Sequence, residues 1–268
     1  MMLLVNLSAK LTDLVISLTI VFGDFSIFLW ETLLSLRFFW RRRGLFLRHC
    51  ELIGVHSTGI TAAAGGFMGA VLGYQLYVSL HQFGSEALLG GTVGVALFRE
   101  LAPVMTGFMV TGRAGAAIAA EISSMRISEQ VDALEVMAVN PIEYLVAPRV
   151  AAGLLMVPVL AILFAVIGSI AAGFVACGVM DLQYSIFLSQ YIKIVDPIEI
   201  IHCLVKSAVF GLVLTWVACF CGFRAYGGAR AVGQATRDTV VASLLTILLS
   251  DYLLTSLLPF GFKKLKVM

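Results

Sequence analysis

Charged residues are scarce in this chain. They make up 13% of its 268 residues, whereas hydrophobic residues make up 60%. A soluble domain typically has about 25% charged and about 45–50% apolar residues, so this composition excludes a soluble globular protein and predicts an integral membrane protein. The length accommodates five or six spanning helices of about 20 residues each but no separate soluble domain of ordinary size, so residues 1–268 are expected to form one transmembrane domain.

Motifs for nucleotide binding, catalysis and metal binding are also absent from the sequence. No Gly-x-x-x-x-Gly-Lys-Ser/Thr loop occurs, because the pair Lys206-Ser207 follows apolar residues and no glycine. The five cysteines and four histidines show no metal-ligand spacing, and no serine or cysteine lies in a nucleophile motif. We predict that the chain is not an enzyme and holds no metal or cofactor, and that any ATP, with its Mg²⁺, is hydrolysed by another polypeptide.

Five apolar runs are long enough to cross a bilayer, and together they predict a transmembrane core over residues 52–260. The N-terminal segment 1–48 is different, because charges interrupt its aromatic-rich sequence and it contains the basic cluster Arg41–Arg43. This pattern favours a helix lying in the membrane interface over a sixth crossing. The expected spans are 52–80, 88–111, 145–176, 198–222 and 239–260.

Lysine and arginine are distributed unevenly over the predicted loops. Most of the 18 basic residues fall before the first span and in the second-to-third and fourth-to-fifth connections. The positive-inside rule makes that side cytoplasmic. The basic residues Lys263, Lys264 and Lys266 after the fifth span are an exception to this topology.

Three glycines, Gly65, Gly69 and Gly73, recur at four-residue intervals in the first span. Such spacing places them on one helix face, where they let another helix backbone approach closely. The pattern predicts helix packing, either in a tight helix pair or around a cavity or subunit contact. Tyr74 and Tyr77, which follow, suit either a cavity wall or the aromatic belt at the membrane interface.

Two charged sites lie at membrane depth. Arg99 and Glu100 fall in the middle of the second span, just before Pro103, which must bend the helix or free a carbonyl. Lys206 lies in the fourth span. An ionised side chain at the bilayer centre costs about 2.5–3.5 kcal/mol on insertion scales, so it usually faces protein or water. A Glu100–Lys206 salt bridge and a polar lining for an amphiphile are both compatible with this pattern.

The segment from Arg126 to Pro141 predicts a short amphipathic helix over about 129–138, too short to cross a bilayer. Its apolar residues fall on one stripe and its acidic residues on another face, and Ser128 could cap its start. We expect it at the cytoplasmic surface, either solvated or as a docking element for a soluble partner. The apolar stripe consists of Ile127, Val131, Leu134 and Ala138, and the acidic face of Glu129, Asp132 and Glu135.

Several of these runs resemble the MlaE (YrbE) permease family, the membrane subunits of ABC transporters that move phospholipids between Gram-negative inner and outer membranes. The resemblance covers roughly residues 45–258. It is carried by Leu97-Phe-Arg-Glu-Leu-Ala-Pro103, Gly112-Arg-Ala-Gly-Ala-Ala-Ile-Ala-Ala-Glu121, the whole run Met125–Pro141, Pro148-Arg149, His202-Cys-Leu-Val-Lys-Ser-Ala-Val-Phe210 and Thr236-Arg-Asp-Thr-Val-Val241.

The resemblance implies an all-α integral membrane protein with an N-terminal interfacial helix, five transmembrane helices and a short cytoplasmic coupling helix. It implies a homodimer enclosing a lipid cavity, a separate cytoplasmic ABC ATPase that receives the coupling helix, and a ring of MCE-domain proteins on the periplasmic side. A STAS-domain protein often joins the ATPase in this family. The implied lipid-cavity residues are Tyr74, Tyr77, Arg99, Glu100 and Lys206, and the implied coupling residues are Arg126, Glu129, Val131, Asp132, Leu134 and Glu135.

The expected function is phospholipid movement between the inner membrane of a Gram-negative bacterium and an external MCE protein or the outer membrane, with no nucleic acid involved. Two other classes stay open. A secondary transporter or channel would use Glu100 and Lys206 to relay ions or protons, and a scaffold would only anchor an external lipid-binding ring. The lipid species and the direction of transport do not follow from the sequence.

Overall fold

A computed structural model describes residue 23 and residues 25–37 and 42–263 of the chain. These residues are almost entirely helical and contain no strand, so the prediction of an all-α fold is confirmed. Five helical stretches are long and apolar enough to cross a membrane, which confirms the predicted number. They are Arg43–His81, Glu86–Ile127, Ile142–Gly178, Pro197–Phe223 and Ala229–Leu257.

Short π-helical or 3-10 segments interrupt the first three of these stretches. The first consists of α2 (Arg43–Cys50), η2 (Glu51–Val55) and α3 (His56–His81). The second consists of η3 (Glu86–Leu88), α4 (Leu89–Ala96), η4 (Leu97–Leu101), α5 (Ala102–Val110), η5 (Thr111–Gly115) and α6 (Ala116–Ile127). The remaining elements are α7 (Gln130–Val136), η6 (Ile142–Val146), α8 (Ala147–Gly178), α9 (Tyr184–Ile194), α10 (Pro197–Phe223) and α11 (Ala229–Lys263).

The second stretch runs further than predicted, because its helix continues to Ile127 and does not end near residue 111. The first charge after the apolar run, Arg113, lies just beyond the predicted end. That charge is accommodated within the helix, since Arg113 Nη1 donates a hydrogen bond to Ser57 Oγ at 3.0 Å. The charge of Arg113 therefore does not mark the end of this helix.

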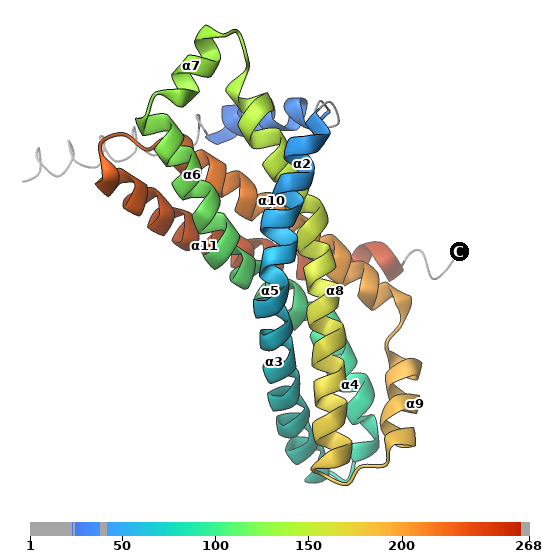
Figure 1. The fold of residues 1–268 in the computed structure, drawn as a ribbon. Helices are drawn as coiled ribbons and strands as arrows, with labels where there is room; N and C mark the ends of the chain where they lie inside the picture. Colours follow the sequence, from blue (N-terminus) through green and yellow to red (C-terminus); the bar gives the residue numbers. More distant parts are fainter. Residues whose placement is uncertain (1–22, 24, 38–41, 264–268) are drawn as a thin grey trace, which may run out of the picture.

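A shorter apolar helix, Phe25–Leu36, precedes the first span and lies across the end of the bundle near α2 (Figure 1). Its Ile27, Trp30 and Leu33 are exposed, as expected for a helix whose apolar face meets lipid at the interface. The first 22 residues of the predicted interfacial segment 1–48, with residues 24 and 38–41, lie outside the described residues. We call the end of the molecule that carries this helix and α7 the α7 end, and the opposite end, where α8 turns into α9, the α9 end.

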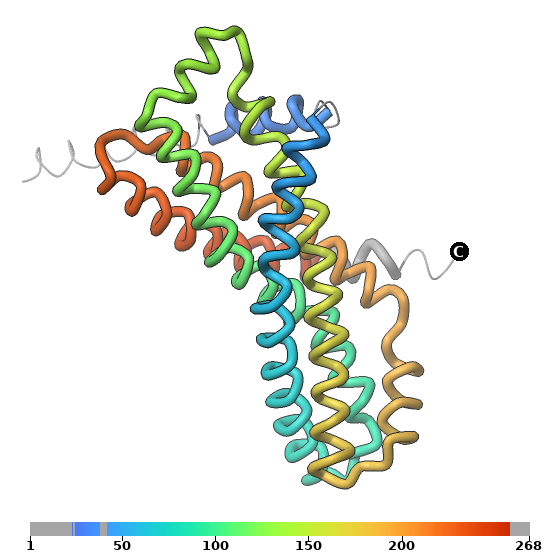
Figure 2. The backbone as a smooth tube through the Cα atoms, viewed as in Figure 1, coloured from blue at the N-terminus to red at the C-terminus, as the bar shows by residue number. Residues whose placement is uncertain are grey.

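The helices α3 and α8 run side by side along much of their length (Figure 2). Gly65, Gly69 and Gly73 are all buried against α8. A Cβ added at Gly65 would lie 2.8 Å from the Phe164 carbonyl oxygen, and one added at Gly69 would overlap the backbone of Gly168. The glycines thus set the distance between the two helix backbones.

Gly69→Ala should therefore destabilise the protein, by about 1–3 kcal/mol as for other overpacked sites, because neither backbone can move aside without disturbing the rest of the helix pair. Gly59→Ala is the matched control in the same helix, since a Cβ there meets nothing within 4 Å. It should be neutral or slightly stabilising. Thermal unfolding of the purified variants in detergent measures both effects, and equal midpoints would contradict the packing role of Gly69.

Candidate functional site

A charged cluster lies between the second, fourth and fifth spans. Lys206 on α10 is only 1% exposed, and its Nζ lies 2.7 Å from Glu100 Oε2, so the predicted salt bridge is present. The same Nζ lies 2.9 Å from Asp251 Oδ1 and donates a hydrogen bond to Thr255 Oγ1 at 2.7 Å, both on α11. One buried ammonium group is therefore shared by two carboxylates, one from the second span and one from the fifth.

The bend in the second span supplies a further partner for Lys206. Pro103 has no N–H to give to the carbonyl of Arg99 four residues earlier, so that carbonyl needs another donor. Lys206 Nζ provides it at 3.0 Å. The π-helical segment η4, which directly precedes α5 and its early Pro103, carries both Arg99 and Glu100. Wide turns of this kind are often found at functional sites.

The rest of the cluster is open on one side. The Glu100 side chain is 39% exposed, although the lysine that it contacts is buried. The guanidinium of Arg99 is half-buried and has no ion-pair partner among the described residues. A cation and a carboxylate are thus accessible next to a buried ion cluster, an arrangement that suits a phosphate-bearing amphiphile.

Asp251 and Thr255 did not emerge from the sequence analysis. A signal was available, because Asp251 is the only acid in the predicted span 239–260, and an acid within a span is a candidate functional residue. Among the described residues, no group of three or more His, Cys, Asp or Glu side chains could hold a metal ion.

The two candidate cavity tyrosines face different surroundings. Tyr74 is exposed on the outside of α3. Tyr77 is half-buried against the core formed by α4 and α8, and its ring stacks on His81 with 5.7 Å between ring centroids. Neither makes a recorded contact with the Lys206 cluster, so the structure does not bring the tyrosines and the charged residues into one site.

The helix α7 projects beyond the ends of the spans (Figure 1). It is shorter than predicted and its start differs, because Glu129, in a left-handed conformation, is the N-cap residue. Ser128 is not the cap: its hydroxyl donates to the Ser124 carbonyl at 2.8 Å, within the last turn of α6. The left-handed conformation of Glu129 interrupts the helix, so α7 is a separate helix and not an extension of α6.

Most of the predicted apolar stripe of α7 points inward. Val131 is 1% exposed and Leu134 is half-buried, whereas Ala138 is exposed. The same chain therefore covers Val131, and its role in coupling stays a prediction. The exposed surface carries Glu129 and Glu135, together with the apolar pair Val136 and Met137, which are 88% and 64% exposed. Val136 is the last residue of α7 and Met137 is its C-cap. The sequence prediction missed this pair because helical periodicity does not describe residues at the end of a helix.

Arg126 holds α7 in place. Its guanidinium forms an ion pair with Asp132 on α7 and donates a hydrogen bond to the Tyr226 hydroxyl at 2.8 Å, in the connection between α10 and α11. Arg126 and Asp132 are therefore engaged with each other, and Glu129 and Glu135 are the predicted coupling residues that remain open to a partner.

A second buried ion pair lies near the same end. Arg149 on α8 is 2% exposed, and its Nη2 lies 2.9 Å from Glu121 Oε2 on α6. Its Nη1 donates to the Leu145 carbonyl at 2.6 Å. The pair joins the end of the second span to the start of the third, on either side of the segment that carries α7.

Comparison with known proteins identifies the family of this chain. The MlaE permease profile matches residues 46–257. A protein of Haemophilus influenzae named "Intermembrane phospholipid transport system permease protein MlaE" is 38% identical over 218 residues, which cover 81% of this chain and 83% of that protein. A "Probable ABC transporter permease protein" of Rickettsia felis is 40% identical over 213 residues, covering 80% of this chain and 82% of the relative.

A plant protein is also similar. Protein TRIGALACTOSYLDIACYLGLYCEROL 1, chloroplastic, of Arabidopsis thaliana is 33% identical over 210 residues, covering 78% of this chain and 60% of the plant protein. The family profile begins within the first membrane-crossing stretch, covers the other four up to Leu257, and includes the Lys206 cluster and α7. The chain is a multi-pass membrane protein and belongs to the MlaE family of ABC transporter permeases.

Proposed function

We propose that this chain moves phospholipids between the inner membrane of a Gram-negative bacterium and an external MCE-domain protein or the outer membrane, as a homodimer driven by a separate ATPase subunit. The observation that carries the proposal is the Lys206 cluster. Lys206 is held by Glu100 and Asp251 at membrane depth, beside the guanidinium of Arg99, which has no ion-pair partner in the described part of the chain. These groups offer a polar surface to a phosphate headgroup within an otherwise apolar region. The name of the Haemophilus relative supports the same substrate class.

The test is lipid transfer by the purified complex in liposomes. Transfer of a labelled phospholipid to the external acceptor should require ATP and should stop when the ATPase subunit is catalytically inactive. Transfer that proceeds unchanged under both conditions would contradict the proposal. Dependence on an ion or proton gradient would favour a secondary transporter, and no transfer with intact assembly would favour a scaffold.

We further propose that α7 is the element that docks on the ATPase. Its exposed surface combines Glu129 and Glu135 with the apolar Val136 and Met137, and such an apolar patch rimmed by charge is typical of a protein interface. Ion pairing by Arg126 orients this surface away from the spans.

Val136→Asp should weaken binding of the ATPase subunit about thirtyfold, the effect of losing an interface hot spot of about 2 kcal/mol, because a carboxylate would be buried without a partner. Val179→Asp is the matched control, since Val179 is also an exposed valine, 61% accessible, but lies in the turn at the α9 end. Co-purification and titration of the ATPase measure the difference. Unchanged binding by the Val136 variant would remove α7 from the interface.

A further inference from the structure

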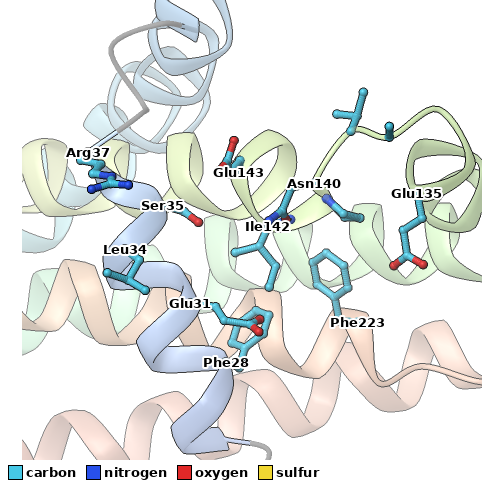
Figure 3. A pocket seen from close by; sticks show the side chains of 13 residues that line it. Phe28, Glu31, Leu34, Ser35, Arg37, Glu135, Asn140, Ile142, Glu143 and Phe223 are labelled. Atoms are coloured by element: carbon cyan, nitrogen blue, oxygen red, sulfur yellow. The ribbon is translucent and has the colours of Figure 1, made fainter.

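A cavity of about 750 Å³ lies at the α7 end, outside the Lys206 cluster. The N-terminal helix forms one side, the connection from α7 to η6 forms another, and the end of α10 forms the floor with Phe223 (Figure 3). Phe223 is 17 residues beyond Lys206 on the same helix, which at 1.5 Å per residue is about 25 Å. The cavity is therefore separate from the charged cluster.

The floor of the cavity is aromatic. The rings of Phe28 and Phe223 lie 5.8 Å apart between centroids and are tilted against each other. Two carboxylates, Glu31 and Glu135, approach the rings from opposite sides, and Glu143 also belongs to the lining with its carboxylate directed away from the rings (Figure 3). None of these three has an ion-pair partner among the described residues.

A hydroxyl on the N-terminal helix also belongs to the cavity lining. Ser35 lines the cavity, and 6% of the whole residue is exposed. Figure 3 shows this hydroxyl directed from the N-terminal helix toward the cavity. A hydroxyl in this position can donate a hydrogen bond to a bound ligand or accept one from it.

We propose that this cavity binds the ammonium headgroup, ethanolamine or choline, of a zwitterionic phospholipid in the leaflet at the α7 end. Aromatic faces combined with carboxylates are the usual recognition chemistry for an organic ammonium ion. Arg37 also belongs to the lining, so the cavity is not lined by acidic side chains alone. Leu34 and Ile142 provide apolar walls for the glycerol and the start of the acyl chains.

The surroundings favour a lipid over a protein as the occupant. The N-terminal helix that forms the wall exposes Trp30, at 66%, with Ile27 and Leu33, so its apolar side is suited to insertion into the headgroup region. The cavity therefore opens at the level of lipid headgroups. A bound headgroup bridges this helix and the connection that carries α7, which links the local lipid to the position of α7.

Native mass spectrometry of the purified full chain tests the proposal without the ATPase. The chain is equilibrated with equal amounts of phosphatidylethanolamine, phosphatidylcholine and phosphatidylglycerol bearing the same acyl chains, and the retained lipids are counted. The two ammonium lipids should be retained about tenfold more than phosphatidylglycerol. This ratio corresponds to the summed binding free energy of one cation–π contact and two partly exposed ion pairs. Free phosphoethanolamine at millimolar concentration is added in a parallel arm. Retention unaffected by it identifies the whole lipid as the ligand, whereas displacement would mean that the headgroup alone suffices and would overturn the assignment to a membrane lipid.

The variant Glu31→Gln/Glu143→Gln should lose this preference while unfolding at the same temperature as the wild type, since Glu31 is exposed, Glu143 is half-buried and neither is ion-paired. Glu135 is left unchanged because it belongs to the proposed ATPase interface. Glu51→Gln/Glu86→Gln removes two carboxylates outside the cavity and should keep the preference. Lipid retained at other sites is common to all variants and cancels in the comparison.

Three further results would overturn the proposal. The first is equal retention of all three lipids by the wild type, and the second is a preference that survives in the cavity variant. The third concerns Leu34→Cys: if the ATPase subunit protects this cysteine from a water-soluble maleimide and phosphatidylethanolamine does not, the occupant of the cavity is a protein. None of these outcomes affects the ATP dependence of lipid transfer, so this proposal and the proposed function fail separately.

Discussion

Lys206→Met is expected to abolish lipid transfer and to destabilise the transmembrane domain. The substitution leaves Glu100 and Asp251 as neighbouring carboxylates without a counter-ion and removes the donor from the Arg99 carbonyl. Removing one partner of a buried ion pair costs about 3–5 kcal/mol. The cost here should fall near the lower end, because Glu100 is partly exposed. Thermal unfolding in detergent and ATP-dependent transfer in liposomes measure the two effects.

A triple variant separates the structural role of the cluster from its role in transport. Lys206→Met/Glu100→Gln/Asp251→Asn removes all three charges together, so no unpaired charge remains and most of the stability should return. Transfer should stay lost, because the polar surface beside Arg99 is gone. If the triple variant transfers lipid at the wild-type rate, the cluster only holds three helices together and has no part in the lipid path.

The membrane fold and half of this cluster could be predicted from the sequence. The cost of placing a charge in a bilayer is large enough that Glu100 and Lys206 each required a partner, and the two were the obvious pair. Which residues of α11 join them depends on how that helix is rotated about its axis. No spacing in the sequence relates residue 206 to Asp251, so the second carboxylate became evident only in three dimensions.

The orientation of α7 could not be predicted from the sequence, for a different reason. Periodicity distinguishes two faces of a helix, but it does not say whether the apolar one is covered by the same chain or offered to a partner. In the structure the protein covers it itself, through Val131. The ion pair of Arg126 with Asp132 fixes this orientation, and two residues six apart in sequence do not reveal such a pair when the chain turns between them.

Glu121→Ala is the second substitution expected to have a large effect. Arg149 is buried on α8, and without Glu121 its guanidinium would keep only the Leu145 carbonyl among the partners described above. Its Nε already lacks one. We expect a loss of about 3 kcal/mol in stability, the lower part of the range for a buried pair, because Glu121 itself is partly exposed. Glu51→Ala, an exposed glutamate without an ion pair, should change the unfolding temperature very little.

A double-mutant cycle identifies the cause of this loss. Arg149→Met alone should cost less than Glu121→Ala, because the carboxylate that it leaves behind can reach solvent. The double variant Glu121→Ala/Arg149→Met should recover part of the loss, since it removes the uncompensated buried charge. The pair also fixes α6 to α8 on either side of α7, so Glu121→Ala should weaken ATPase binding even though Glu121 lies outside the exposed surface of α7. A destabilised variant that binds the ATPase normally would show that α7 is held by Arg126 alone and that the Glu121–Arg149 pair acts only on the stability of the helix bundle.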